Sequence, residues 1–136
     1  MASSDYDFDV ICYGTISADD LIYVPYVPTS RRDSQVMEDY QRLGGEAVTV
    51  ARVLSVWGLR VAISGNAIGD DEWGRFIRRQ LDGYPGIDTR FLVQRSDVRT
   101  PFCRILVTPD GERSILGYWF DDVPKIPLTE ELMRRA

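Results

Sequence analysis

Two polar side chains directly follow the first apolar run of the chain, which spans residues 8–14. Residues 14–19 read Gly-Thr-Ile-Ser-Ala-Asp. In open α/β sheets, ligands bind outside the carboxyl ends of the strands. Ser17 would offer a hydroxyl and Asp19 a carboxylate, and these groups suit the vicinal hydroxyls of a sugar. The alternative is that both side chains only satisfy backbone groups of a turn.

Two further motifs lie at the starts of expected helices. The pair Gly44-Gly45 leaves the first helical N–H groups free to point at an oxyanion or hydroxyl, although a tight turn explains it without a ligand. Residues 69–74 read Gly-Asp-Asp-Glu-Trp-Gly. A metal site there is conceivable, but a helix cap followed by first-turn acids is the simpler interpretation, and we assign no metal site.

The elements that must position these residues alternate between strand and helix in the first part of the chain. Short apolar runs at 8–14 and 60–65 predict buried strands. Helical spacing runs from the glycine pair to residues 57–58, and again over 70–83. This alternation indicates a parallel sheet of the doubly wound type.

A second group of strands is predicted outside that alternation. Residues 102–107 and 114–119 read as strands joined by the turn Thr-Pro-Asp-Gly at 108–111. Three further strands are expected at 21–24, which is bounded by prolines, at 35–43, which has no purely apolar face, and at 91–93. We expect the segments near 21 and 36 to pair with the hairpin as a small second sheet. Thr129 reads as the cap of a last helix.

Composition excludes several classes of protein. The 136 residues are 44% hydrophobic with a net charge of −5, which is ordinary globular composition without the basic surface of a nucleic-acid binder. The absence of histidine rules out Ser-His or Cys-His catalysis within this chain. Cys12 and Cys103 read as buried thiols in a reduced compartment. No secretion signal and no apolar run near roughly 18 residues is present, so we expect a soluble, cytoplasmic protein with no membrane partner.

Taken in order, the motifs resemble the ribokinase (PfkB) carbohydrate-kinase family over residues 8–132. The family's first turn corresponds to residues 14–19 and its glycine pair to residues 44–51. Its G-D-D-x-x-G helix start corresponds to residues 69–74. Its threonine-led lid strand corresponds to Thr100 and its D-G-E-R hairpin to residues 110–113. The resemblance implies an α/β fold, with a Rossmann-like ribokinase-type layer and a small β-sheet lid, incomplete at the C-terminus. Residues 1–136 would then be the N-terminal part of one domain, with its body at about 7–19, 44–90 and 121–136 and its lid at about 20–43 and 91–120.

The resemblance also implies an activity, which is ATP-dependent phosphoryl transfer to a sugar or nucleoside hydroxyl with Mg²⁺. The family's substrate aspartate corresponds to Asp19, and its glycine-pair contact corresponds to Gly44 and Gly45. Ser17 and Thr49 stand where the family has asparagines. Because these substitutions shorten or remove an amide that would bond a hydroxyl, we expect altered substrate choice or weaker binding.

The family's catalytic aspartate lies in a late G-A-G-D segment that these 136 residues do not contain. Asp121 and Asp122 lack flanking glycines and are no substitute, so we assign no catalytic residue and no ATP-binding segment to this chain. By itself it should show no sugar-dependent ATP consumption. The alternative is a non-catalytic module that binds a small ligand or forms a homodimer through its lid strands. A nicotinamide-dependent oxidoreductase is disfavoured, because no G-x-G-x-x-G fingerprint is present.

Overall fold

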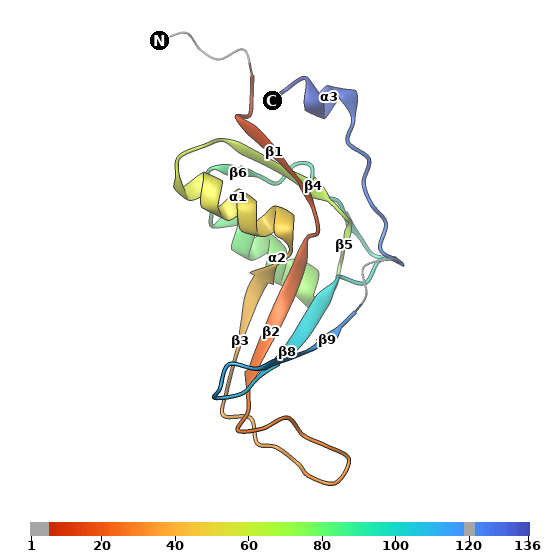
Figure 1. Ribbon diagram of the computed structural model, residues 1–136. Coiled ribbons are helices and arrows are strands. Elements are labelled where there is room, and N and C mark those ends of the chain that lie inside the picture. Colours follow the sequence, from red (N-terminus) through yellow and green to blue (C-terminus); the bar gives the residue numbers. More distant parts are fainter. Residues whose placement is uncertain (1–5, 119–121) are drawn as a thin grey trace.

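The predicted alternation of strands and helices is confirmed. The computed structural model describes residues 6–118 and 122–136. Strands β1 (Val10–Gly14), β4 (Val61–Gly65) and β6 (Ile87–Asp88) form a parallel sheet in the order β1-β4-β6. Helices α1 (Glu46–Val56) and α2 (Glu72–Asp82) supply residues to the same apolar core as Cys12 and Ile63, so both helices cover one face of this sheet (Figure 1). We call the parallel sheet with α1 and α2 the α/β layer.

The opposite face of the parallel sheet is covered by chain ends. Phe8 and Leu132 pack there against Ala62, with Ile11 and Phe91 beside them. Leu132 belongs to the short helix α3 (Glu130–Met133), which Thr129 caps as expected by accepting a hydrogen bond from the N–H of Leu132. None of the helices in the described part of the chain is long and apolar enough to span a membrane.

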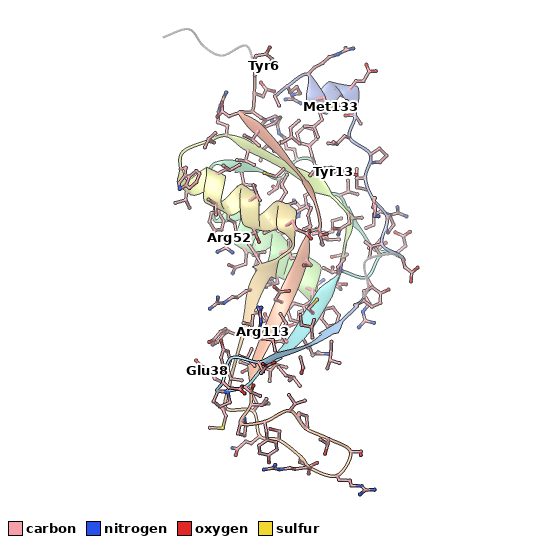
Figure 2. The ribbon with its side chains drawn as sticks, in the orientation of Figure 1. Tyr6, Tyr13, Glu38, Arg52, Arg113 and Met133 are labelled. Carbon is pink, nitrogen blue, oxygen red and sulfur yellow. The ribbon has the colours of Figure 1, made fainter. Side chains whose placement is uncertain are left out.

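The expected second sheet is also present, and we call it the lid. It contains β3 (Glu38–Gly44), β2 (Ser17–Tyr23), β8 (Phe102–Val107) and β9 (Arg113–Gly117), in the order β3-β2-β8-β9. Strand β2 runs antiparallel to β3 and parallel to β8. The lid projects away from the parallel sheet (Figure 1), and Glu38 and Arg113 lie at its far end (Figure 2).

Several elements differ from the sequence-based expectation. Strand β2 begins at Ser17, so residues 17–19 belong to the lid sheet and not to the α/β layer. Residues 91–93 form no strand, because Leu92 turns back into the core and its N–H bonds the carbonyl of Thr89. The nearby strands are β7 (Gln94–Arg95) and its parallel partner β5 (Ile68–Gly69), neither of which was predicted. Strand β9 ends at Gly117, and residue 119 of the expected strand lies outside the described residues.

Helix packing was predicted better for α2 than for α1. Ile77 and Leu81 of α2 are fully buried, with Trp73 and Phe76 packed against the same core. On α1 the buried residues are Ala47, Val48 and Ala51, whereas Val50 and Val56 are 50% and 73% exposed. The apolar residues of α1 therefore surround the helix instead of forming one inward face.

Candidate functional site

Asp19 and Gly44 meet on one face of the lid. Ser17 pairs with Gly44 across β2 and β3, so Asp19, two residues further along β2, points to the same side of the sheet as Gly44. A Cβ atom added at Gly44 would lie 2.6 Å from Oδ1 of Asp19 and 2.8 Å from its Cγ. Glycine at this position therefore leaves the space that the carboxylate fills.

The carboxylate of Asp19 has no partner. It is partly buried, and within residues 6–118 and 122–136 no hydrogen bond or ion pair reaches it. Its cross-strand neighbour Arg42 instead places its guanidinium 5.2 Å from the ring centre of Tyr40. Cys103 lies opposite Asp19 on β8, and its thiol pKa is raised by burial and by the nearby charge of Asp19. Burial also raises the pKa of Asp19.

Gly45 fixes the start of α1 against the turn that precedes β2. Its φ is 92°, and a Cβ atom there would overlap the carbonyl of Thr15. Only glycine combines this dihedral with so close an approach. Hydrogen bonding from the Thr15 hydroxyl is the largest cause of a lowered pKa at Glu46, the next residue. The glycine pair thus ties the first turn of α1 to the backbone that leads into Asp19.

Asn66 holds the same backbone from the other side, and sequence reasoning missed it. Its side chain is buried; Oδ1 accepts from the N–H of Ile16 at 2.7 Å, and Nδ2 donates to the carbonyl of Ile16 at 3.0 Å. A buried amide with all these bonds made is a strong positional restraint. Asn66 follows Gly65, the last residue of β4, so the rule that drew attention to residues 14–19 would have found it.

Four of the five candidate substrate-binding residues lie together where β2 meets the start of α1, and Thr49 lies apart from them. Ser17 is buried and pairs with Gly44, beside Asp19 and Gly45. Thr49 lies on the exposed side of α1, where its hydroxyl donates to the carbonyl of Gly45 at 2.9 Å. The Thr49 hydroxyl therefore bonds the backbone at the start of its own helix.

A small cavity lies at the carboxyl ends of β1 and β4, beside the turn that leads to Asp19. Its volume is about 270 Å³, and it is lined by Tyr13, Gly14, Thr15, Gly65, Asn66 and Lys125. The Asn66 amide and the Tyr13 hydroxyl in its lining are already hydrogen-bonded to backbone carbonyls, so Lys125 supplies the charge of this cavity. This is the sheet edge at which α/β proteins bind ligands.

The acidic motif at residues 69–74 has a structural use. Asp71 caps α2 by accepting from the N–H of Gly74 at 2.8 Å, and its two oxygens also accept from Thr100. Asp70 and Glu72 are exposed, and the described residues contain no group of three or more acidic or cysteine side chains placed to hold a metal ion. The contacts of Asp71 follow the capping interpretation.

A helix-covered parallel sheet that carries a four-stranded lid is the ribokinase fold. A ribokinase from Arabidopsis thaliana, solved with ribose and ATP, has this fold, with a TM-score of 0.72 and 18% identity over 81% of this chain and 35% of its own. The pfkB family carbohydrate kinase model matches residues 7–130. The chain belongs to the pfkB family of carbohydrate kinases.

Two further relatives are more similar in sequence. A nucleoside kinase from Methanothermobacter thermautotrophicus is 27% identical over 113 residues, which are 83% of this chain and 36% of the relative. A ribokinase from Cryptococcus neoformans, solved with ADP, is 25% identical with a TM-score of 0.64, over 80% of this chain and 33% of its own. The chain thus spans only about a third of the length of these relatives.

Proposed function

We propose that the whole protein transfers the γ-phosphoryl group of ATP to a hydroxyl of a sugar or nucleoside, and that this chain supplies the substrate-binding and lid elements. The observation that carries the proposal is the partly buried, unpartnered carboxylate of Asp19 against Gly44. A carboxylate left without a partner is available to accept hydrogen bonds from two adjacent hydroxyls.

Each site residue has a part in this proposal. Asp19 accepts from the substrate hydroxyls, while Gly44 leaves room for its carboxylate. The first turn of α1 follows Gly45 without a side-chain cap, and Asn66 keeps the backbone before Ser17 in place. Phosphoryl transfer depends mainly on positioning and on stabilising developing charge, so a chain with these residues would orient the acceptor. We place the catalytic base and the ATP and Mg²⁺ contacts outside this chain.

The substrate we propose carries a ribose-like diol. The curated relative is a nucleoside kinase, and two of the solved relatives are ribokinases, one with ribose bound. Free ribose and ribonucleosides share vicinal ring hydroxyls, which one carboxylate can bind together. ATP and ADP occur in these solved relatives, which supports ATP as the phosphoryl donor. The unpaired thiols of Cys12 and Cys103 support a reducing, cytoplasmic location.

Two adjacent aspartates provide the test. Asp19→Asn removes the charge of the candidate ligand, and Asp20→Asn is a matched control on the opposite face of β2, where Asp20 pairs with Arg104 at 3.5 Å. Calorimetric titration of the chain with D-ribose and with adenosine should show binding that Asp19→Asn weakens at least about tenfold and Asp20→Asn leaves unchanged. Equal affinity of wild type and Asp19→Asn would contradict the proposal, as would a wild-type chain that binds neither compound.

A second candidate function rests on the lid edge. Ile115 and Leu116 of β9 are 58% and 63% exposed, and β9 and β3 each pair on one side only among the described strands. Exposed apolar residues on an unpaired strand favour pairing with another sheet. We therefore propose that the lid also forms a homodimer, either together with the kinase function or as the role of a non-catalytic, ligand-binding module.

A further inference from the structure

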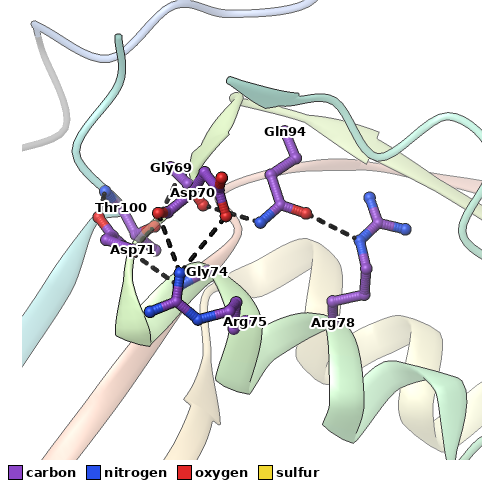
Figure 3. A network of polar contacts seen from close by, with 8 residues as sticks. All are labelled: Gly69, Asp70, Asp71, Gly74, Arg75, Arg78, Gln94 and Thr100. Carbon is purple, nitrogen blue, oxygen red and sulfur yellow. Dashed lines mark hydrogen bonds and ion pairs between the residues drawn. The ribbon is translucent and has the colours of Figure 1, made fainter. Parts of the chain in front are cut away.

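The root of strand β8 is held to the start of α2 by a fully satisfied polar cluster (Figure 3). Thr100 is fully buried; its hydroxyl donates to Oδ1 of Asp71 at 2.6 Å and accepts from the N–H of Gly69 at 2.8 Å. The N–H of Thr100 donates to Oδ2 of Asp71 at 2.8 Å. Thr100 thus makes three hydrogen bonds within one joint, two of them with Asp71, which is 29 residues away in the sequence. The joint is rigid because these buried polar groups all have partners.

The two glycines of the same motif let this joint close. A Cβ atom at Gly74 would overlap the carbonyl oxygen of Gly69 and lie 2.9 Å from the Thr100 hydroxyl oxygen. A Cβ atom at Gly69 would lie 2.6 Å from Oδ2 of Asp71. The motif therefore brings α2, β5 and Thr100 closer together than side chains at the two glycines would allow.

The joint leads directly to the candidate site. The carbonyl of Pro101, next to Thr100, accepts from the N–H of Ala18 at 3.1 Å, one residue before Asp19. Phe102, the first residue of β8, stacks on Trp73 of α2 with ring centres 5.2 Å apart and planes at 14°. Residues 100–102 therefore contact α2 on one side and β2 on the other. At this edge they connect the α/β layer to the lid.

We propose that Asp71 and Thr100 form a latch that fixes the angle of the lid against the α/β layer, and so sets the position of Asp19 relative to that layer. In this role Asp71 and Thr100 are positioning residues that touch no ligand. Within the described residues, the bonds of Asn66 to Ile16 and the glycine pair before α1 also connect the lid to the α/β layer. The latch is a property of the fold alone, whereas its consequence for a ligand rests on the proposed function.

Amide hydrogen exchange tests the latch without any ligand. Thr100→Val keeps the shape of the side chain but loses the hydroxyl, and Thr100→Ser restores the hydroxyl. Asp70→Asn is the matched control, since the Asp70 side chain is exposed and, among the described residues, bonds Arg75 and no group of the joint. We expect Thr100→Val to speed exchange in β2 and β8 at least about tenfold while β1 and β4 change little, because the lid then opens separately from the layer. Thr100→Ser and Asp70→Asn should match wild type.

Two results would overturn the latch. One is unchanged exchange in β2 and β8 of folded Thr100→Val, and the other is an equal loss of protection in both sheets, which indicates a general loss of stability. If Thr100→Val does not fold, Asp71→Asn, which keeps one acceptor oxygen, decides between the same outcomes. A ribose titration of each variant then reports separately on the proposed function. Weaker binding in Thr100→Val, restored in Thr100→Ser, supports the consequence for ligand binding at Asp19. A lid that opens without loss of affinity contradicts it.

Discussion

Asp19 and Asp20 are neighbours in the sequence that the strand turns to opposite faces of the lid. Asp20 faces Arg104 and forms an ion pair at 3.5 Å, while Asp19 faces Gly44 and Cys103 without a partner. Side chains alternate across a strand, so a difference of one residue decides which acid is neutralised. The charge that the fold leaves unpaired is the one that we assign to ligand binding.

That assignment predicts a gain in stability when Asp19 loses its charge. Burial raises the pKa of Asp19, so protonation of Asp19 favours the folded state. This stabilisation is complete below the unfolded pKa and is lost as the pH rises through the folded pKa. At neutral pH the carboxylate is charged and disfavours folding. Asp19→Asn should therefore increase the free energy of unfolding by about 0.5 kcal/mol at neutral pH, with the gain shrinking in acid. Urea unfolding at several pH values measures this.

The control for that measurement is Asp20→Asn. It removes an ion-paired charge, so no gain in stability is expected. A stability increase of the same size in both variants would point to the net charge of the chain and not to the burial of Asp19.

Asp71 should show the opposite pH dependence. Burial acts to raise its pKa, but hydrogen bonds from the hydroxyl and N–H of Thr100 and from the N–H of Gly74 outweigh it, and the pKa lies below its ordinary value. The contribution of ionised Asp71 to the free energy of unfolding is therefore present above the unfolded pKa and is lost as the pH falls through the folded pKa. Asp71→Asn should lower the free energy of unfolding by about 1–3 kcal/mol at neutral pH. The difference from wild type should narrow in acid; a constant difference across the pH range would contradict this account.

Sequence reasoning identified individual residues well when the signal was local. A cap followed by acids at the start of α2, and Thr129 as the cap of α3, follow from residue type and position within a few residues. The partnership of Asp71 with Thr100 spans 29 residues, and that of Asn66 with Ile16 spans 50. Such pairs depend on how two sheets meet, which no local pattern encodes.

At the scale of elements, the same distinction separates predicted from unpredicted structure. Strand β8 and helix α2 were located within two residues, because alternating or helical apolar spacing ends there at proline and glycine. The apolar run at 91–93 is buried by a turn and not by a ladder, since Leu92 enters the core next to β5. A short apolar run predicts that its residues are buried, but it does not predict their backbone conformation.

In helix α2, helix propensity and packing predict opposite changes in stability for the replacement of Gly74 by alanine. Alanine normally stabilises a helix interior relative to glycine by up to about 1 kcal/mol. Gly74→Ala should instead lower the free energy of unfolding by about 1–3 kcal/mol, because its Cβ would overlap the Gly69 carbonyl and press on Thr100. Thermal and urea unfolding measure the change.

Gly83→Ala at the end of the same helix is the matched control. Gly83 has ordinary helical dihedrals, and its nearest obstacle is the Gln80 carbonyl at 3.2 Å, so we expect little change in stability. A neutral or stabilising Gly74→Ala would show that the α2–β8 joint is looser than its hydrogen bonds indicate.

Two of the exposed apolar surfaces among the described residues are candidates for contact between copies of the chain. One lies on α1 and contains Val50, Val53, Val56 and Trp57, which are 44–73% exposed. The other is Ile115 and Leu116 on the outer strand of the lid. Composition gave no indication of either, because exposure depends on which face of an element the fold leaves uncovered. Of these two surfaces, the lid surface is the one that lies on a strand pairing on one side only among the described strands.

That difference predicts which surface joins two copies of the chain. Leu116→Lys should weaken self-association at least about tenfold, because a charge on an edge strand opposes pairing with a second sheet. Val56→Lys places the same charge on α1, at a residue that is even more exposed, and should leave association unchanged. Sedimentation equilibrium over a range of concentrations measures both. A monomeric wild-type chain would contradict the lid dimer, and dissociation by Val56→Lys alone would assign the contact to α1.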